Sequence, residues 1–87
     1  MATRKEKVVQ PNTSAIAQAF SHWLQATREK LGRSRYALAK AGWVKDSTLK
    51  ALEDRGHDPK LSTFVAACQG LGQNPATVLA ELLKEVE

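Results

Sequence analysis

Residues 34–56 form the stretch that most constrains the fold of this chain, and they read SRYALAKAGWVKDSTLKALEDRG. Ser34 carries the side chain of a helix N-cap, and Gly42 interrupts the short helix that is expected after it. After the glycine, Leu49 and Leu52 stand three residues apart and lie on the same side of a second helix. The outer face of that helix is polar and carries Lys45, Ser47, Thr48 and Lys50. Two short helices joined by a glycine-bearing turn are typical of a helix-turn-helix.

The order of residues within and around this motif matches a known pattern. The matching residues are Arg28, Leu38, Ala39, Val44, Ser47, Thr48, Leu49, Leu52, Glu53, Gly56, Pro59, Thr63, Leu71 and Gly72. In this order, with no gap between Leu38 and Glu53, the chain resembles the lambda-repressor-like (Cro/XRE-type) helix-turn-helix regulators over residues 20–83. The resemblance implies an all-α, five-helix lambda-repressor-like domain over residues 13–87, with its helix-turn-helix at about residues 34–55.

Length and composition limit the chain to one small domain. Its 87 residues, 43% hydrophobic and 25% charged, are ordinary for a folded protein and allow a core of only a few helices. No apolar run approaches a membrane span, and Val8-Val9 is too short for a signal peptide, so we expect a cytoplasmic protein. Cys68 is the only cysteine, and beside Phe64 and Leu71 we interpret it as a small core residue rather than a reactive thiol.

The net charge of +4 is unevenly distributed along the chain. Bases outnumber acids in residues 1–12 and 33–60, whereas residues 61–87 are net acidic. The positive charge therefore lies on the N-terminal segment and on the helix-turn-helix, which is the polarity that a DNA-facing surface requires. Without the motif, a solvated face that needs no partner would explain the scattered lysines equally well.

The chain before the motif divides into an arm and one long helix. Residues 1–12 have no apolar periodicity and are predicted to be a flexible basic arm, which either follows a DNA backbone or minor groove or has no role. A polar residue among Asn12–Ser14 is expected to cap the first helix, which ends near Leu31 before the left-handed Gly32. The apolar spacing predicts a buried face of Ile16, Phe20, Leu24, Thr27 and Leu31.

Two further helices are expected after the motif. Residues 54–60 contain Gly56 and Pro59 and are predicted to form a loop. The helix predicted over residues 61–71 turns inward Leu61, Phe64, Val65, Cys68 and Leu71. Asn74 as N-cap and Pro75 at the first helical position predict a last helix over residues 75–86. Its apolar residues are Val78, Leu79, Leu82, Leu83 and Val86.

A single small domain cannot easily cover all five of these last apolar side chains. Members of the resembled family commonly dimerise through this end of the domain, so the resemblance implies a homodimer surface on residues 75–86. Acidic Glu81, Glu85 and Glu87 fit a surface that is kept away from DNA. Two recognition helices would then lie about 34 Å apart and read an inverted repeat. The alternative is that the five residues complete the core of one chain.

The resemblance also implies roles in binding double-stranded DNA. The residues implied to contact DNA are Arg35, Tyr36, Lys45, Ser47, Thr48, Lys50 and Arg55. Lysine and arginine suit phosphate or guanine, serine suits either kind of contact, and threonine suits the backbone or a thymine methyl. Tyr36 either donates to a phosphate or packs against the first helix. Arg28 and Glu53 are implied to pair and tie the first helix to the recognition helix, a structural role that we favour over phosphate contact by Arg28.

Three residues depart from the family pattern, two at base-reading positions and one in the turn. Asp46 would repel phosphate, so it either caps the recognition helix, which we favour, or accepts a hydrogen bond from a cytosine amino group. Ala51 falls at a base-reading position of the resembled family but is too short to hydrogen-bond with a base. Trp43 stands where the family commonly has glycine, so the turn is expected to differ slightly.

No constellation for catalysis occurs in the sequence. There is no paired nucleophile and base and no phosphate loop, and His57-Asp58 has no further metal ligand at a suitable spacing. We therefore expect no enzyme, cofactor or metal site. The resemblance implies a sequence-specific transcriptional regulator that represses by occupying the major groove and excluding polymerase. The alternatives are an antitoxin or other protein-interaction module, with a toxin as partner, and an adaptor that has lost DNA binding.

Overall fold

The computed structural model describes residues 13–86. Five α-helices are present there, α1 (Thr13–Lys30), α2 (Arg35–Lys40), α3 (Asp46–Arg55), α4 (Leu61–Gly70) and α5 (Pro75–Val86). No strand occurs among the described residues, so the predicted all-α class is confirmed. The predicted arm, residues 1–12, lies outside the described part of the chain, as do the side chains predicted to cap the first helix.

Local sequence signals set the ends of the helices. The hydroxyl oxygen of Ser34 accepts a 3.0 Å hydrogen bond from the backbone N–H of Ala37, which confirms its N-cap role. At the start of α5, Asn74 Oδ1 accepts a 2.8 Å bond from the N–H of Ala76. Gly42 has a φ of 88°, a left-handed value that ends α2 and redirects the chain towards α3. The loop predicted over residues 54–60 is shorter, because α3 continues to Arg55.

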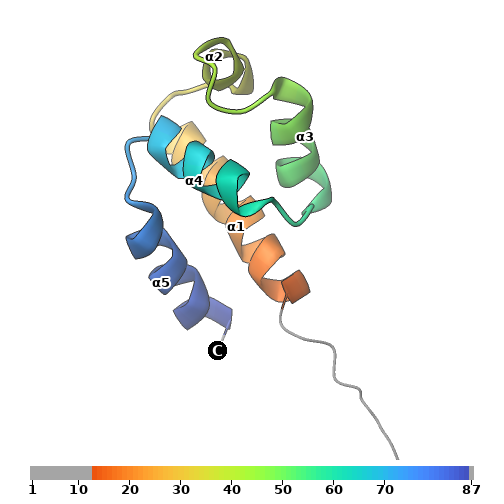
Figure 1. The fold of residues 1–87 in the computed structure, drawn as a ribbon, viewed down its shortest axis with the longest axis vertical. Coiled ribbons are helices and arrows are strands. Elements are labelled where there is room, and N and C mark those ends of the chain that lie inside the picture. Colours follow the sequence, from red (N-terminus) through yellow and green to blue (C-terminus); the bar gives the residue numbers. More distant parts are fainter. Residues whose placement is uncertain (1–12, 87) are drawn as a thin grey trace, which may run out of the picture.

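The long α1 lies between α3 and α5 and contacts both, while α2 packs on α3 and α4 packs on α5 (Figure 1). The Phe20 ring of α1 lies at the centre of the core, with its centroid 5.0 Å from that of Phe64 and 5.8 Å from that of Trp23. The largest fully buried side chains are Phe20, Leu24, Leu38, Leu49, Leu52, Cys68 and Leu82. Because α2 and α3 both supply such side chains, the core fixes their orientation to each other.

Two leucines that were predicted to face the core are exposed. Leu31 is 45% exposed because it follows the last residue of α1, where the chain turns through Gly32. Leu61 is 77% exposed because it is the first residue of α4 and precedes Phe64, the first core residue of that helix. Ser21 is buried instead, and its hydroxyl donates a 2.9 Å hydrogen bond to the backbone oxygen of Glu53.

The apolar residues of α5 are divided between the core and the surface. Val78 and Leu82 are buried within the chain, so assigning them to a dimer surface was wrong. Val86 is half-buried and packs against the same core. Leu79 and Leu83 are 39% and 41% exposed, because each lies one helical position round from a buried neighbour.

The turn between α2 and α3 is held against the end of α4. Trp43 packs on Gly70 so closely that a Cβ atom added to this glycine would lie 2.8 Å from Cγ of the indole. Arg33, which precedes α2, donates a 2.8 Å hydrogen bond from Nη1 to the carbonyl oxygen of Gly70. The last residue of α4 therefore supports the segments before and after α2.

Candidate nucleic-acid interface

The outer face of α3 is polar and the inner face is apolar. Leu49 and Leu52 are buried, whereas Lys45, Ser47 and Lys50 are exposed. Thr48 is half-buried at the edge between the two faces. We define the α3 face as the outward side chains of α3 and its N-cap together with Lys60, the residue before α4. Its members are Lys45, Ser47, Thr48, Lys50, Arg55 and Lys60. The buried leucines fix the direction in which these side chains project.

The first turn of α3 differs from the prediction in its cap. Lys45 occupies the N-cap position with an extended backbone, and its side chain makes no capping hydrogen bond. Asp46 is the first helical residue, one position too late for its carboxylate to serve as the N-cap, so the favoured capping role was wrong. Its negative charge still lies in the first turn, where it is stabilised by the helix dipole.

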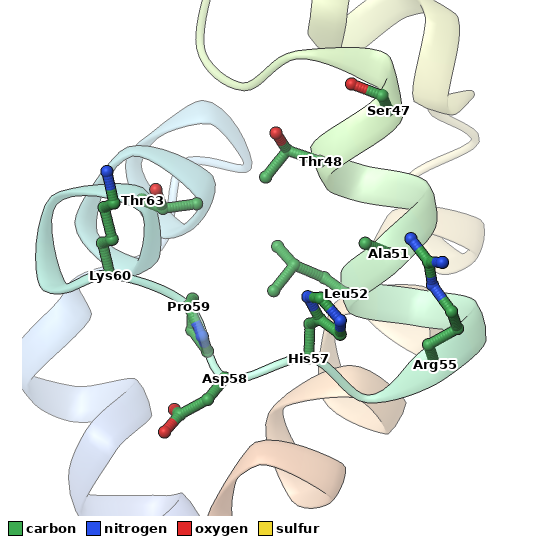
Figure 2. A pocket seen from close by; sticks show the side chains of 10 residues that line it. All are labelled: Ser47, Thr48, Ala51, Leu52, Arg55, His57, Asp58, Pro59, Lys60 and Thr63. Atoms are coloured by element: carbon green, nitrogen blue, oxygen red, sulfur yellow. The ribbon is translucent and has the colours of Figure 1, made fainter.

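A cleft of about 440 Å³ separates α3 from the loop and the first turn of α4. Figure 2 shows Thr48 and Leu52 on the α3 wall, with Lys60 and Thr63 on the opposite wall. Arg55 lies at the far end of α3 and is exposed. The cleft thus has hydroxyl groups along its walls and cationic side chains at its edge, a combination that suits phosphate oxygens.

Arg28 and Glu53 form the ion pair that the family resemblance implies. Arg28 Nε lies 2.8 Å from Glu53 Oε2, and Nη2 lies 2.9 Å from Oε1, which is a bidentate arrangement. The carboxylate is only 1% exposed. The hydrogen bond with Glu53 raises the pKa of Arg28 above its usual value, against the opposing effect of burial. The pair joins α1 to α3.

Arg35 and Tyr36 begin α2 and differ in what they contact. Arg35 Nη1 donates a 3.3 Å hydrogen bond to Oδ2 of Asp54, near the end of α3. Tyr36 is 68% exposed, which rules out the alternative that it packs against the first helix. The ammonium group of Lys40 lies 5.8 Å from the centroid of the Tyr36 ring. The phenol is therefore at the surface beside the Lys40 side chain, where it is open to solvent or a ligand.

Among the predicted DNA-contacting residues, Ser47, Thr48 and Arg55 line the cleft, and Ser47, Lys50 and Arg55 line a second hollow on α3. Ala51 is the exception among the family's base-reading positions, because it is buried at the floor of the cleft. Sequence reasoning missed the contact between Asp54 and Arg35, which forms because the start of α2 approaches the end of α3. The signal in the sequence was weak, a second acid directly after Glu53.

Three further observations concern metal ligands, the single thiol and membrane-spanning helices. They contain no group of three or more His, Cys, Asp or Glu side chains that could hold a metal ion. Cys68 is fully buried, and burial raises the pKa of its thiol to about 11, so it remains protonated at neutral pH. None of the described helices combines the length and the apolar character needed to cross a membrane.

Comparison with known proteins adds no further assignment. No family model, curated protein or solved structure matches this chain. The candidate interface is therefore defined by this chain's own geometry: a polar α3 face on an apolar base, held by a bidentate ion pair.

Proposed function

We propose that this chain is a lambda-repressor-like helix-turn-helix domain that binds double-stranded DNA sequence-specifically and represses transcription. The observation that carries the proposal is the α3 face. Its polar and cationic side chains project from a short helix whose opposite side is buried, with α2 packed beside it. A helix with this division is what the major groove admits, because one side must remain free while the other holds the helix in place.

The side chains of the α3 face have different roles in this proposal. Lys45, Ser47 and Lys50 are exposed and read base edges, with the lysines suited to guanine. Thr48, at the edge of the cleft, contacts the backbone or a thymine methyl. Arg55 and Lys60, at the two ends of the loop, hold phosphates. Repression is then steric, because a helix in the major groove excludes polymerase from the same DNA.

Self-association of the chain is part of the same proposal. Leu79 and Leu83 are exposed residues of α5, and α1 lies between this helix and α3 (Figure 1). Two copies that pair through these leucines would present two α3 helices to one side of a duplex. The preferred target is accordingly an inverted repeat whose half-sites lie about 34 Å apart.

Fluorescence anisotropy tests the proposal. The full chain is titrated against labelled duplex DNA from upstream of its own gene and against a scrambled duplex, at several salt concentrations. We expect tight binding to the upstream duplex that weakens steeply with salt, because each neutralised phosphate releases counterions. Lys50→Ala is expected to weaken binding about tenfold, the effect of losing one good base contact.

Lys84→Ala is the matched control, because Lys84 is an exposed lysine on α5 and lies outside the α3 face. Equal loss of affinity in both variants would mean that only overall charge matters and would contradict a specific role for the α3 face. Equal binding of the wild type to both duplexes would contradict sequence-specific recognition. Failure to bind either duplex at low salt would overturn the proposal and favour the protein-interaction alternative.

A further inference from the structure

A surface ion pair joins the start of α2 to the end of α3. Arg35 is the first residue of α2, and Asp54 is the last but one of α3. Arg35 Nη1 lies 3.3 Å from Asp54 Oδ2, and the two side chains remain 32% and 48% exposed. Because the pair is open to solvent, it is easily broken and contributes little to the stability of the fold.

The distances from Arg35 to the two neighbouring carboxylates show which of them it hydrogen-bonds. Both carboxylate oxygens of Glu53 already accept hydrogen bonds from Arg28. Arg35 Nε comes no closer than 4.0 Å to Glu53 Oε1, which is an electrostatic contact rather than a hydrogen bond. The carboxylate that Arg35 hydrogen-bonds among the described residues is therefore that of Asp54.

Asp54 also lies among groups that the proposed function assigns to DNA. A shallow hollow at the end of α3 is lined by Ser47, Lys50, Asp54 and Arg55. Three of these belong to the α3 face, and Asp54 is the only acid among the four. A carboxylate offers a guanidinium group the same kind of oxygen acceptors as a phosphate does. Asp54 thus offers Arg35 the kind of acceptor that a DNA phosphate would offer.

We propose that Asp54 is a positioning residue that holds Arg35 against α3 and competes with DNA phosphate for its guanidinium group. This inference rests on the proposed DNA-binding function. The pair must open before Arg35 binds a phosphate, and the freed carboxylate then repels the backbone. Asp54 therefore lowers the affinity for duplex DNA and acts through Arg35 in doing so.

A double-mutant cycle tests this competition. Anisotropy titrations with one duplex compare the wild type, Asp54→Asn, Arg35→Gln and the double variant. Asp54→Asn is expected to raise the affinity about threefold to fivefold, the range that an exposed ion pair allows. In the Arg35→Gln background the same change is expected to raise the affinity less, because the repulsion between Asp54 and the backbone is still removed but no guanidinium remains to be released. Urea denaturation should find the stabilities of all four proteins nearly equal, since the pair is exposed.

Asp58→Asn is the matched control, because it makes the same change of charge in the loop after α3. In Figure 2 the carboxylate of Asp58 points away from α3. Its effect on affinity, whatever the size, is expected to be the same with and without Arg35. The inference is overturned if Asp54→Asn and Asp58→Asn act alike, if the Asp54→Asn gain persists fully without Arg35, or if Asp54→Asn weakens binding.

The same titrations separate this inference from the function on which it rests. If the wild type binds duplex DNA and Asp54→Asn leaves its affinity unchanged, only the competition by Asp54 is overturned. If the wild type binds no duplex even at low salt, the DNA-binding function fails, and the role of Asp54 fails with it.

Discussion

At the scale of single residues, removing the partner of the Glu53 carboxylate should cost the most stability. This carboxylate is charged and almost fully buried, and Arg28 is its one strong side-chain partner. Removing one member of a buried ion pair leaves the other charge desolvated without compensation. Arg28→Met is therefore expected to lower the free energy of unfolding by about 3 kcal/mol. Urea denaturation, monitored by circular dichroism, measures this loss of stability.

The double variant Arg28→Met/Glu53→Leu removes both charges together. It is expected to recover much of the lost stability, since apolar replacement of a buried pair is often nearly neutral. Lys84→Met, an exposed substitution of the same kind on α5, serves as the control and should change stability little. A loss below about 1 kcal/mol for Arg28→Met, the value typical of a surface pair, would contradict the buried-pair account.

The buried thiol of Cys68 makes stability depend on alkaline pH. In the folded protein its pKa is about 11, compared with a usual value of 9.0. Between these values the unfolded chain releases the thiol proton while the folded chain keeps it, so unfolding becomes more favourable as pH rises. The resulting loss of stability is expected to reach about 2 kcal/mol by pH 11.

Comparison with Cys68→Ala isolates this effect from other groups that titrate in the same range. The stability difference between wild type and variant, measured by urea denaturation, should shrink as the pH rises from about 9 to 11. A thiol reagent such as Ellman's reagent should label the folded wild type far more slowly than the unfolded chain at pH 8. Rapid labelling of the folded protein would contradict the burial of this residue.

At the scale of helices, the contact between Trp43 and Gly70 joins the α2–α3 turn to α4. Gly70→Ala places a Cβ atom against the indole and is expected to cost about 1–3 kcal/mol, as overpacking typically does. In a Trp43→Ala background the contacts with the indole ring are gone and only a 3.1 Å contact with Cβ of residue 43 remains, so the same change should cost clearly less stability. Urea denaturation of the four proteins measures this difference between the two backgrounds.

Gln69→Ala is the control for helix propensity in this cycle, because Gln69 is the exposed preceding residue of α4. It should have the same small effect whether residue 43 is tryptophan or alanine. If Gly70→Ala is equally harmless in both backgrounds, the indole does not depend on this glycine for its position.

Signals that are local in sequence predicted the helices of this fold well. Ser34, Gly42 and Asn74 act on the backbone within four residues of themselves, so their roles followed from residue type alone. The exposure of Leu61 could not be predicted in this way, because it depends on where α4 first meets the core. Periodicity identified an apolar helix over residues 75–86 but could not divide its apolar residues between the core and the surface, because that division depends on where α1 lies.

The candidate site was predictable in part for the same reason. The α3 face follows from the helical spacing of polar and apolar residues within a single helix, so the sequence alone is sufficient to find it. The Arg28–Glu53 pair could be expected only from the family resemblance. Its two residues lie 25 positions apart, so no pattern that is local in the sequence links them. The pairing of Arg35 with Asp54 arises only where α2 and α3 approach each other in the folded chain, and so no pattern within either helix revealed it.

At the scale of the whole molecule, the exposed leucines of α5 lead to a prediction about assembly. Leu79 and Leu83 lie one helical turn apart and form an apolar strip beside the buried Val78 and Leu82. Because the described part of a single chain leaves the strip open to water, burying it against a second copy would be favourable. We expect sedimentation velocity to find an association of the wild type that increases with concentration.

Leu83→Glu is expected to abolish that association, because it would bury a charge in the apolar contact. Thr77→Glu is the matched control: it adds the same charge to an exposed position of α5, and two residues of helix place it about 200° round from Leu79. If the dimer positions two α3 helices on DNA, Leu83→Glu should lose affinity for an inverted repeat while binding a single half-site as the wild type does. Thr77→Glu should leave both affinities unchanged. A wild type that remains monomeric yet binds the inverted repeat no better than a half-site would show that one α3 helix is the complete reading unit of this molecule.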